Sequence, residues 1–132
     1  MAQTLDQQRA AFAWDAAKRA QQALPQFGDF KNLAKGAPAL IMGNGLMPAL
    51  AFYASRDKDH ARALNEAING WLAARFKDHI AFKPLPRTFS EVMERLLQAK
   101  AGSMFYMQAT DETLAMLKWL RQFADALDKE GA

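Results

Sequence analysis

The segment Leu46-Met47-Pro48-Ala49-Leu50-Ala51-Phe52-Tyr53-Ala54-Ser55 decides the fold class, because it is apolar on nearly every side of a helix. A helix at the surface would carry polar residues along one face, so we expect this helix to be the central buried element. Pro48 suits its first turn, where proline is tolerated. The preceding Gly43-Asn44-Gly45 consists of residues that accept the left-handed conformation and end helices. The segment therefore predicts a buried helix with a break just before it.

Two helices are expected before the central one. Thr4 followed by Gln7 is a capping-box pattern, so a first helix is predicted from there to about Leu24, where the next residue is a proline. A second helix is predicted over residues 30–41, in which apolar residues recur at helical spacing. Pro38 lies inside this segment, so the sequence predicts either a kink or a helix that restarts one residue before the proline.

Three further helices are expected after residue 55. Asp59 is a plausible N-cap for a fourth helix, which a regular apolar stripe extends to Phe76. Residues 80–87 contain two prolines and are expected to form an irregular connection. Thr88 with Glu91 repeats the capping-box pattern and opens a fifth helix.

The last helix carries a candidate protein interface. We expect the fifth helix to end at Gly102 and the last one to begin behind Thr110, where two acidic residues would suit the positive end of the helix dipole. Met116, Trp119 and Phe123 lie beside the inner face of this helix and widen its apolar surface. These three residues are therefore predicted to contact a partner protein.

Composition supports the same fold class. Valine occurs once and threonine four times, whereas good helix formers are abundant, so propensity favours helix over strand. A chain of 132 residues with 51% hydrophobic content can bury one core. The sequence therefore predicts an all-α fold, a single compact bundle of about six helices, with residues 1–132 forming one domain.

The sequence offers no sign of export or of a membrane. Cysteine is absent, which excludes a disulfide scaffold and thiolate zinc sites. The first residues lack the basic and apolar regions of a signal peptide, and there is no uncharged apolar run of about 18 residues. We therefore expect a soluble, cytoplasmic protein without a membrane partner.

Positive charge gives a weak indication of a nucleic-acid partner. The formal net charge is +3 and the pI is near 9.3. Lys18 and Arg19 are adjacent, and Lys31 and Lys35 share a helix face at a spacing where like charges repel. Such repulsion indicates an anionic partner, but it is also ordinary on a solvated helix face. These four residues are the candidate nucleic-acid-binding residues, and the basic residues of segment 56–62 are weaker candidates because aspartates dilute their charge.

The residues needed for catalysis are largely missing. The two histidines form the pairs Asp59-His60 and Asp78-His79, which reverse the His-Asp order of metal-dependent phosphohydrolases. They are expected at opposite ends of one helix, too far apart to share an ion. The sequence therefore predicts no catalytic residue, no metal site, no cofactor and no small-molecule substrate, although a hydrolase using these four residues stays open as a minor alternative.

Three stretches together resemble the small-subunit family of the type III-B CRISPR (Cmr) effector complex. The resemblance extends from about Arg9 to Leu127 and is weakest over 79–103. Gln122 departs from it, because a basic residue often precedes the Phe-Ala pair in the family. The matching stretches are Lys31-Asn32-Leu33-Ala34 with Pro38-Ala39-Leu40-Ile41, Asn44-Gly45-Leu46 and Ala49-Leu50-Ala51-Phe52-Tyr53; Tyr106 with Thr110-x-Glu112-x-Leu114; and Trp119-Leu120-x-x-Phe123-Ala124.

The resemblance implies a non-catalytic helical subunit of a prokaryotic antiviral ribonucleoprotein. In that family, copies stack head to tail beside the backbone that carries the crRNA, and the target RNA lies in the groove between. The implied partners are other Cmr subunits, further copies of the chain, and crRNA and target single-stranded RNA bound weakly and without sequence preference. The alternative from a different class is a helical protein-protein adaptor that makes no RNA contact.

Overall fold

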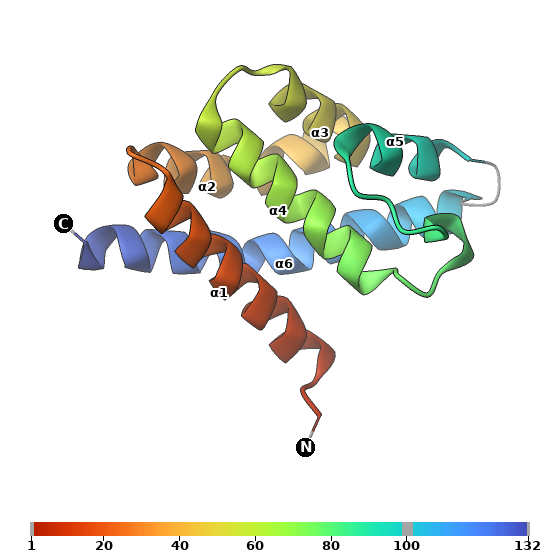
Figure 1. The fold of residues 1–132 in the computed structure, drawn as a ribbon, viewed down its shortest axis with the longest axis horizontal. Coiled ribbons are helices and arrows are strands. Elements are labelled where there is room, and N and C mark those ends of the chain that lie inside the picture. The colour runs from red at the N-terminus through yellow and green to blue at the C-terminus, as the bar shows by residue number, and fades with distance from the viewer. Residues whose placement is uncertain (1, 99–101, 132) are drawn as a thin grey trace.

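The all-α prediction is confirmed by a computed structural model, which describes residues 2–98 and 102–131 (Figure 1). Within those ranges the chain forms six α-helices and one short 3-10 turn and contains no strand. The elements are α1 (Leu5–Ala23), α2 (Phe27–Asn44), α3 (Leu46–Ser55), α4 (Asp59–Arg75), η1 (Ile80–Phe82), α5 (Phe89–Leu97) and α6 (Gly102–Glu130).

Helix α6 is the longest helix, and most of the other helices pack against it. It is 29 residues long and runs behind the other helices from one end of the view to the other, with α1 crossing it diagonally (Figure 1). Helices α1, α2, α4 and α5 all contact it. The buried side chains of the described residues form one hydrophobic core, which lies between α6 and the helices packed on it.

The central position expected for α3 is wrong. Leu46, Leu50 and Tyr53 are buried, but Phe52 is about half exposed. The helix packs mainly on α2 and α4, at the edge of the bundle, so it has only one buried face. Apolar residues all round a helix therefore overstated its burial, because single exposed apolar residues are common on protein surfaces.

The start of α6 also differs from the sequence prediction. Thr110 does not cap a helix; it lies inside α6, where its hydroxyl donates a hydrogen bond to the Tyr106 carbonyl at 3.0 Å. Phe105 and Ala109 are buried and extend the apolar stripe of α6 towards its N-terminus. The fifth helix ends earlier than expected, at Leu97, and residues 99–101 lie outside the described ranges.

Both predicted capping boxes are confirmed. The Thr4 side chain accepts a hydrogen bond from the Gln7 amide, and the Thr88 side chain accepts one from the Glu91 amide. Asp59, in contrast, is not the N-cap of α4, because that position belongs to Lys58 and Asp59 is the first helical residue. Its carboxylate accepts a hydrogen bond from Arg62 at 2.8 Å instead.

Helix α2 passes through Pro38 without restarting. Buried residues on both sides of the proline, Ala34, Ala37 and Ile41, pack into the core and hold the helix where one backbone donor is missing. The helix ends at Asn44, and Gly45 makes the break with a φ of 98°. This positive φ is strained for residues with a side chain, so the predicted glycine break before α3 is confirmed.

Candidate nucleic-acid and protein interfaces

The two candidate lysines of α2 are paired with acids from α6. The Nζ atom of Lys31 lies 3.1 Å from Asp128, and that of Lys35 lies 3.9 Å from Asp125. Lys129 also pairs with Asp125, at 3.5 Å. The like charges predicted to repel one another are therefore offset by carboxylates from the far end of the chain, which helical spacing alone cannot reveal.

The two candidate cations of α1 lie in different surroundings. The Nζ atom of Lys18 lies 5.8 Å from the ring centre of Trp14, a cation-π contact. Arg19 is exposed and makes no ion pair with the described residues. It lines a groove of about 340 Å³ between α1 and α4. Of the four predicted cations, Arg19 is the one most available to a phosphate.

The predicted protein interface is corrected at Met116, which is fully buried in the core and offers no surface to a partner. Trp119 and Phe123 are half-buried and stack on each other, with ring centres 5.8 Å apart. Trp14 of α1 meets Phe123 edge-on at 5.2 Å and keeps 42% of its surface exposed. The surviving apolar edge is therefore shared between α1 and α6.

A second apolar surface, which was not predicted from the sequence, lies where α5 meets α6. Leu97, Met104 and Met107 are 71%, 68% and 61% exposed. Leu97 and Met107 line a hollow of about 430 Å³ together with Tyr106. Exposure of several neighbouring large apolar side chains is unusual for a protein without partners, so this surface is the stronger candidate for a subunit contact.

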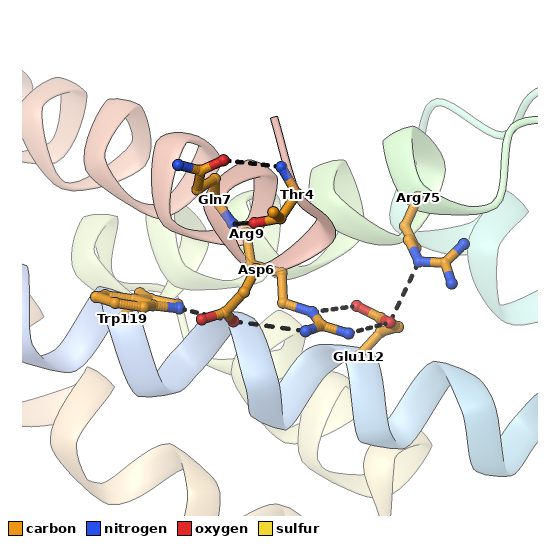
Figure 2. A network of polar contacts seen from close by, with 7 residues as sticks. All are labelled: Thr4, Asp6, Gln7, Arg9, Arg75, Glu112 and Trp119. Carbon is orange, nitrogen blue, oxygen red and sulfur yellow. Dashed lines mark hydrogen bonds and ion pairs between the residues drawn. The ribbon is translucent and has the colours of Figure 1, made fainter. Parts of the chain in front are cut away.

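A polar network ties α1, α4 and α6 together (Figure 2). Glu112 of α6 accepts two hydrogen bonds from Arg9 of α1, at 2.9 Å from Nε and 2.7 Å from Nη2. The Nε atom of Arg75, on α4, lies 3.2 Å from the same carboxylate but is not aligned for a hydrogen bond. Asp6 joins the network by accepting from Arg9 and from the indole N–H of Trp119, at 3.5 Å and 3.2 Å.

The charges in this network stabilise one another. Burial alone would raise the pKa of Glu112, but the hydrogen bonds from Arg9 and the positive charges of Arg9 and Arg75 hold that pKa below its ordinary value. The hydrogen bond from Arg9 to Glu112 in turn raises the pKa of the guanidinium. Glu112 is only 7% exposed, and in the sequence it interrupts the apolar stripe of α6. Because a buried acid requires a positively charged partner, this interruption was a sequence signal for an internal ion pair.

His79, one of the four residues of the hydrolytic alternative, makes local contacts. The Nδ1 atom of His79 accepts a hydrogen bond from the Ala81 amide at 3.0 Å, and its ring stacks on Phe105 with centres 4.1 Å apart. Asp59 is engaged with Arg62. Across residues 2–98 and 102–131 there is no group of three or more histidine, cysteine, aspartate or glutamate side chains arranged to hold a metal ion.

The helices of the described ranges are all too short or too polar to cross a bilayer. Known proteins resemble this chain in sequence and in structure. A curated protein of Thermus thermophilus, the CRISPR system Cmr subunit Cmr5, is 30% identical over 103 residues, which is 78% of each chain. A crystal structure of a CRISPR-associated Cmr5 family protein from the same organism superposes with a TM-score of 0.73 at 28% identity, covering 96% of this chain and 98% of that one.

The family resemblance seen in the sequence motifs is confirmed by these matches. The sequence profile described as CRISPR-associated protein (Cas_Cmr5) matches residues 5–127, which includes all six helices except the last residues of α6. The chain therefore belongs to the Cas_Cmr5 family, the small subunits of the type III-B CRISPR (Cmr) complex.

Proposed function

We propose that the chain, folded as one helical domain of residues 1–132, is a non-catalytic building block of a Cmr ribonucleoprotein in the prokaryotic cytoplasm. Copies stack along the complex and help to hold crRNA and target single-stranded RNA. The observation that carries this proposal is the agreement in fold with a Cmr5 family protein over 96% of the chain. Agreement over nearly the whole chain supports a shared architectural role rather than a shared fragment.

The internal contacts support a role as a rigid block. Helix α6 runs the length of the molecule, and the Arg9-Glu112-Arg75 network joins α1 and α4 to it. A block of this kind keeps its surfaces in fixed positions when copies repeat along a filament. A net charge of +3 is then sufficient, because weak phosphate contacts repeated along one RNA add up to strong overall binding.

The test is affinity purification of the tagged protein from its native cell, followed by mass spectrometry and sequencing of the RNA that co-purifies. We expect other Cmr subunits together with repeat-derived RNA. Recovery of the protein alone, without RNA or other Cmr subunits, would contradict the proposal.

The second candidate function is a protein-protein adaptor that makes no RNA contact. Two observations favour it: Lys31 and Lys35 are paired with aspartates, and Leu97 and Met107 expose an apolar surface. Both functions share assembly with Cmr subunits, so only an RNA measurement separates them.

Charge reversal of the candidate cations separates the two functions. In the reconstituted complex, Lys18→Glu with Arg19→Glu and, separately, Lys31→Glu with Lys35→Glu are compared for cross-linking of RNA to this subunit. Loss in either pair supports the RNA-contacting function. A wild-type subunit that assembles but never cross-links to RNA would favour the adaptor.

A further inference from the structure

A groove lies between α3, α4 and the segment that leads into α5. Its volume is about 660 Å³, within the range of pockets that hold a small organic ligand. Tyr53, Asn65 and Val92 are almost completely buried and form the inner wall, together with Pro86 and the half-buried Phe89. Apolar and aromatic surface therefore lies at the bottom of the groove.

The outer part of the groove carries an excess of arginine. Three arginines line it, Arg56, Arg62 and Arg87, against two carboxylates, Asp57 and Glu66. Asp57 is fully exposed and turned to solvent, and its contact with Arg62 is 3.5 Å.

Two of these arginines are uncommitted. Arg56 and Arg87 make no ion pair with the described residues, and the guanidinium of Arg56 lies 5.4 Å from the ring centre of Phe52. Arg62 is held by Asp59 as well as by Asp57. The groove is thus lined by two guanidinium groups that have no carboxylate partner among the described residues.

Two asparagines, Asn65 and Asn69, also line the groove. Asn69 donates a hydrogen bond to Asn65 at 2.6 Å, and Asn65 donates one to the Leu50 carbonyl. The Oδ1 atom of Asn69 is buried and has no donor among the described residues. A buried acceptor without a donor costs free energy, so the wall of the groove is not fully satisfied in the isolated chain.

We propose that this groove receives one unstacked nucleotide of single-stranded RNA, with the base against the half-buried Phe89 and the adjoining phosphates on Arg56 and Arg87. The inference rests on the proposed RNA contact and names its place. Arginine binds phosphate bidentately, and aromatic surfaces accept any base, so the site is expected to be indifferent to sequence. A neighbouring groove, lined by Arg19, shares Glu66 and Gly70 with this one and continues the path across α4.

A peptide segment from a partner protein is the competing occupant. The two uncommitted arginines favour RNA, because a neutral or basic peptide would leave both guanidinium groups without a counter-charge. The test uses the reconstituted complex with a guide-complementary RNA that carries 4-thiouridine at each position in turn, so that RNA in the groove is identified by its cross-link. We expect RNA cross-links in the peptides that contain Tyr53 or Phe89.

Two variants distinguish insertion of a base into the groove from attraction of the RNA by positive charge alone. Ala54→Trp fills the groove from α3 without changing charge, and it should reduce RNA cross-linking to this subunit by about fivefold or more, the least expected when one base loses its stacking surface. Ala51→Trp is the matched control, because Ala51 is exposed on the same helix and does not line the groove. The control should cross-link like the wild type.

The second variant, Arg56→Gln with Arg87→Gln, should lower RNA binding and reduce its logarithmic salt slope by about 1.4 for each copy, the effect of two phosphate contacts. Lys118→Gln with Lys129→Gln is the control, because it also removes two positive charges, from exposed positions on α6. If Ala54→Trp does not fold, which thermal unfolding reveals, this pair decides the question alone.

The outcomes distinguish the inference from the proposed function. RNA cross-links elsewhere on the subunit, with both groove variants unaffected, would overturn the groove assignment and leave the RNA-contacting function standing. A cross-link between the groove and a partner protein, formed in a parallel sample with a protein–protein cross-linker, would also overturn the assignment. If the wild-type subunit assembles and gives no RNA cross-link anywhere, the proposed RNA contact itself fails.

Discussion

Glu112 is the residue on which the contact between α1, α4 and α6 depends. It is 7% exposed, and both of its carboxylate oxygens are engaged by Arg9. A buried acid is tolerated because two guanidinium groups surround it, and each of those has only partial access to solvent, 20% for Arg9 and 35% for Arg75. Removing the acid would leave two crowded cations facing each other.

Glu112→Gln is therefore expected to destabilise the fold by about 2–3 kcal/mol, measured by urea unfolding at neutral pH. Asp111→Asn is the control, because Asp111 is exposed on the same turn and forms no ion pair with the described residues. The control should change stability by no more than about 0.5 kcal/mol. Equal effects of the two substitutions would contradict the structural role of the network.

The pH dependence of stability follows from the same carboxylate. The pKa of Glu112 is lower in the folded protein than the ordinary value of 4.5. A lowered pKa means that the contribution is complete above about pH 4.5 and is lost as the pH falls through the folded pKa. The free energy of unfolding should therefore fall below pH 4.5 more steeply in the wild type than in Glu112→Gln, which a urea series from about pH 7 to about pH 3 measures. Parallel curves for the two proteins would contradict this account.

At the scale of elements, α3 depends on a cap supplied by another helix. The residue before α3 is glycine, which has no side chain to cap the first turn. The Met47 amide instead donates a hydrogen bond to the hydroxyl of Tyr106 on α6, at 2.9 Å. This contact links the glycine break to α6 and places two stretches of the family motif in direct contact.

Tyr106→Phe should cost about 1 kcal/mol of stability, because the Met47 amide loses its partner in the first turn of α3. Tyr53→Phe is the matched control: Tyr53 is on α3 itself, and its hydroxyl makes no hydrogen bond with the described residues. Thermal or urea unfolding of the two variants checks the difference. A cost for Tyr53→Phe as large as that for Tyr106→Phe would show that the hydroxyl is not acting as a cap.

At the scale of the whole molecule, the apolar surface at Leu97, Met104 and Met107 should carry contacts with another Cmr subunit. Met104→Gln with Met107→Gln is expected to reduce incorporation into the reconstituted complex while leaving the melting temperature nearly unchanged, because these side chains are already in water in the isolated fold. Ile80→Gln, at a similarly exposed apolar residue that does not line the hollow between α5 and α6, is the control, and native mass spectrometry measures incorporation. Full incorporation of the double variant would show that this surface makes no contact needed for assembly.

The sequence by itself determined the helical content, both capping boxes and the glycine break, because each depends on residues within a few positions of one another. It also identified the family through motifs that the comparisons confirm. The prediction that Thr110 begins a helix failed because its hydroxyl has a second use, bonding to a carbonyl one turn back inside a longer helix.

Only the tertiary structure decided which charges are free and which apolar residues are exposed. Lys31 and Lys35 are offset by aspartates that are distant in sequence, whereas Arg56, discounted in the sequence because of its acidic neighbours, is uncommitted. Met116 is buried and Met107 is exposed, although both lie on α6. Local spacing fixes which residues share a helix face, but the neighbour that each face meets is set by how distant helices pack, and that packing decides the surface on which a partner can bind.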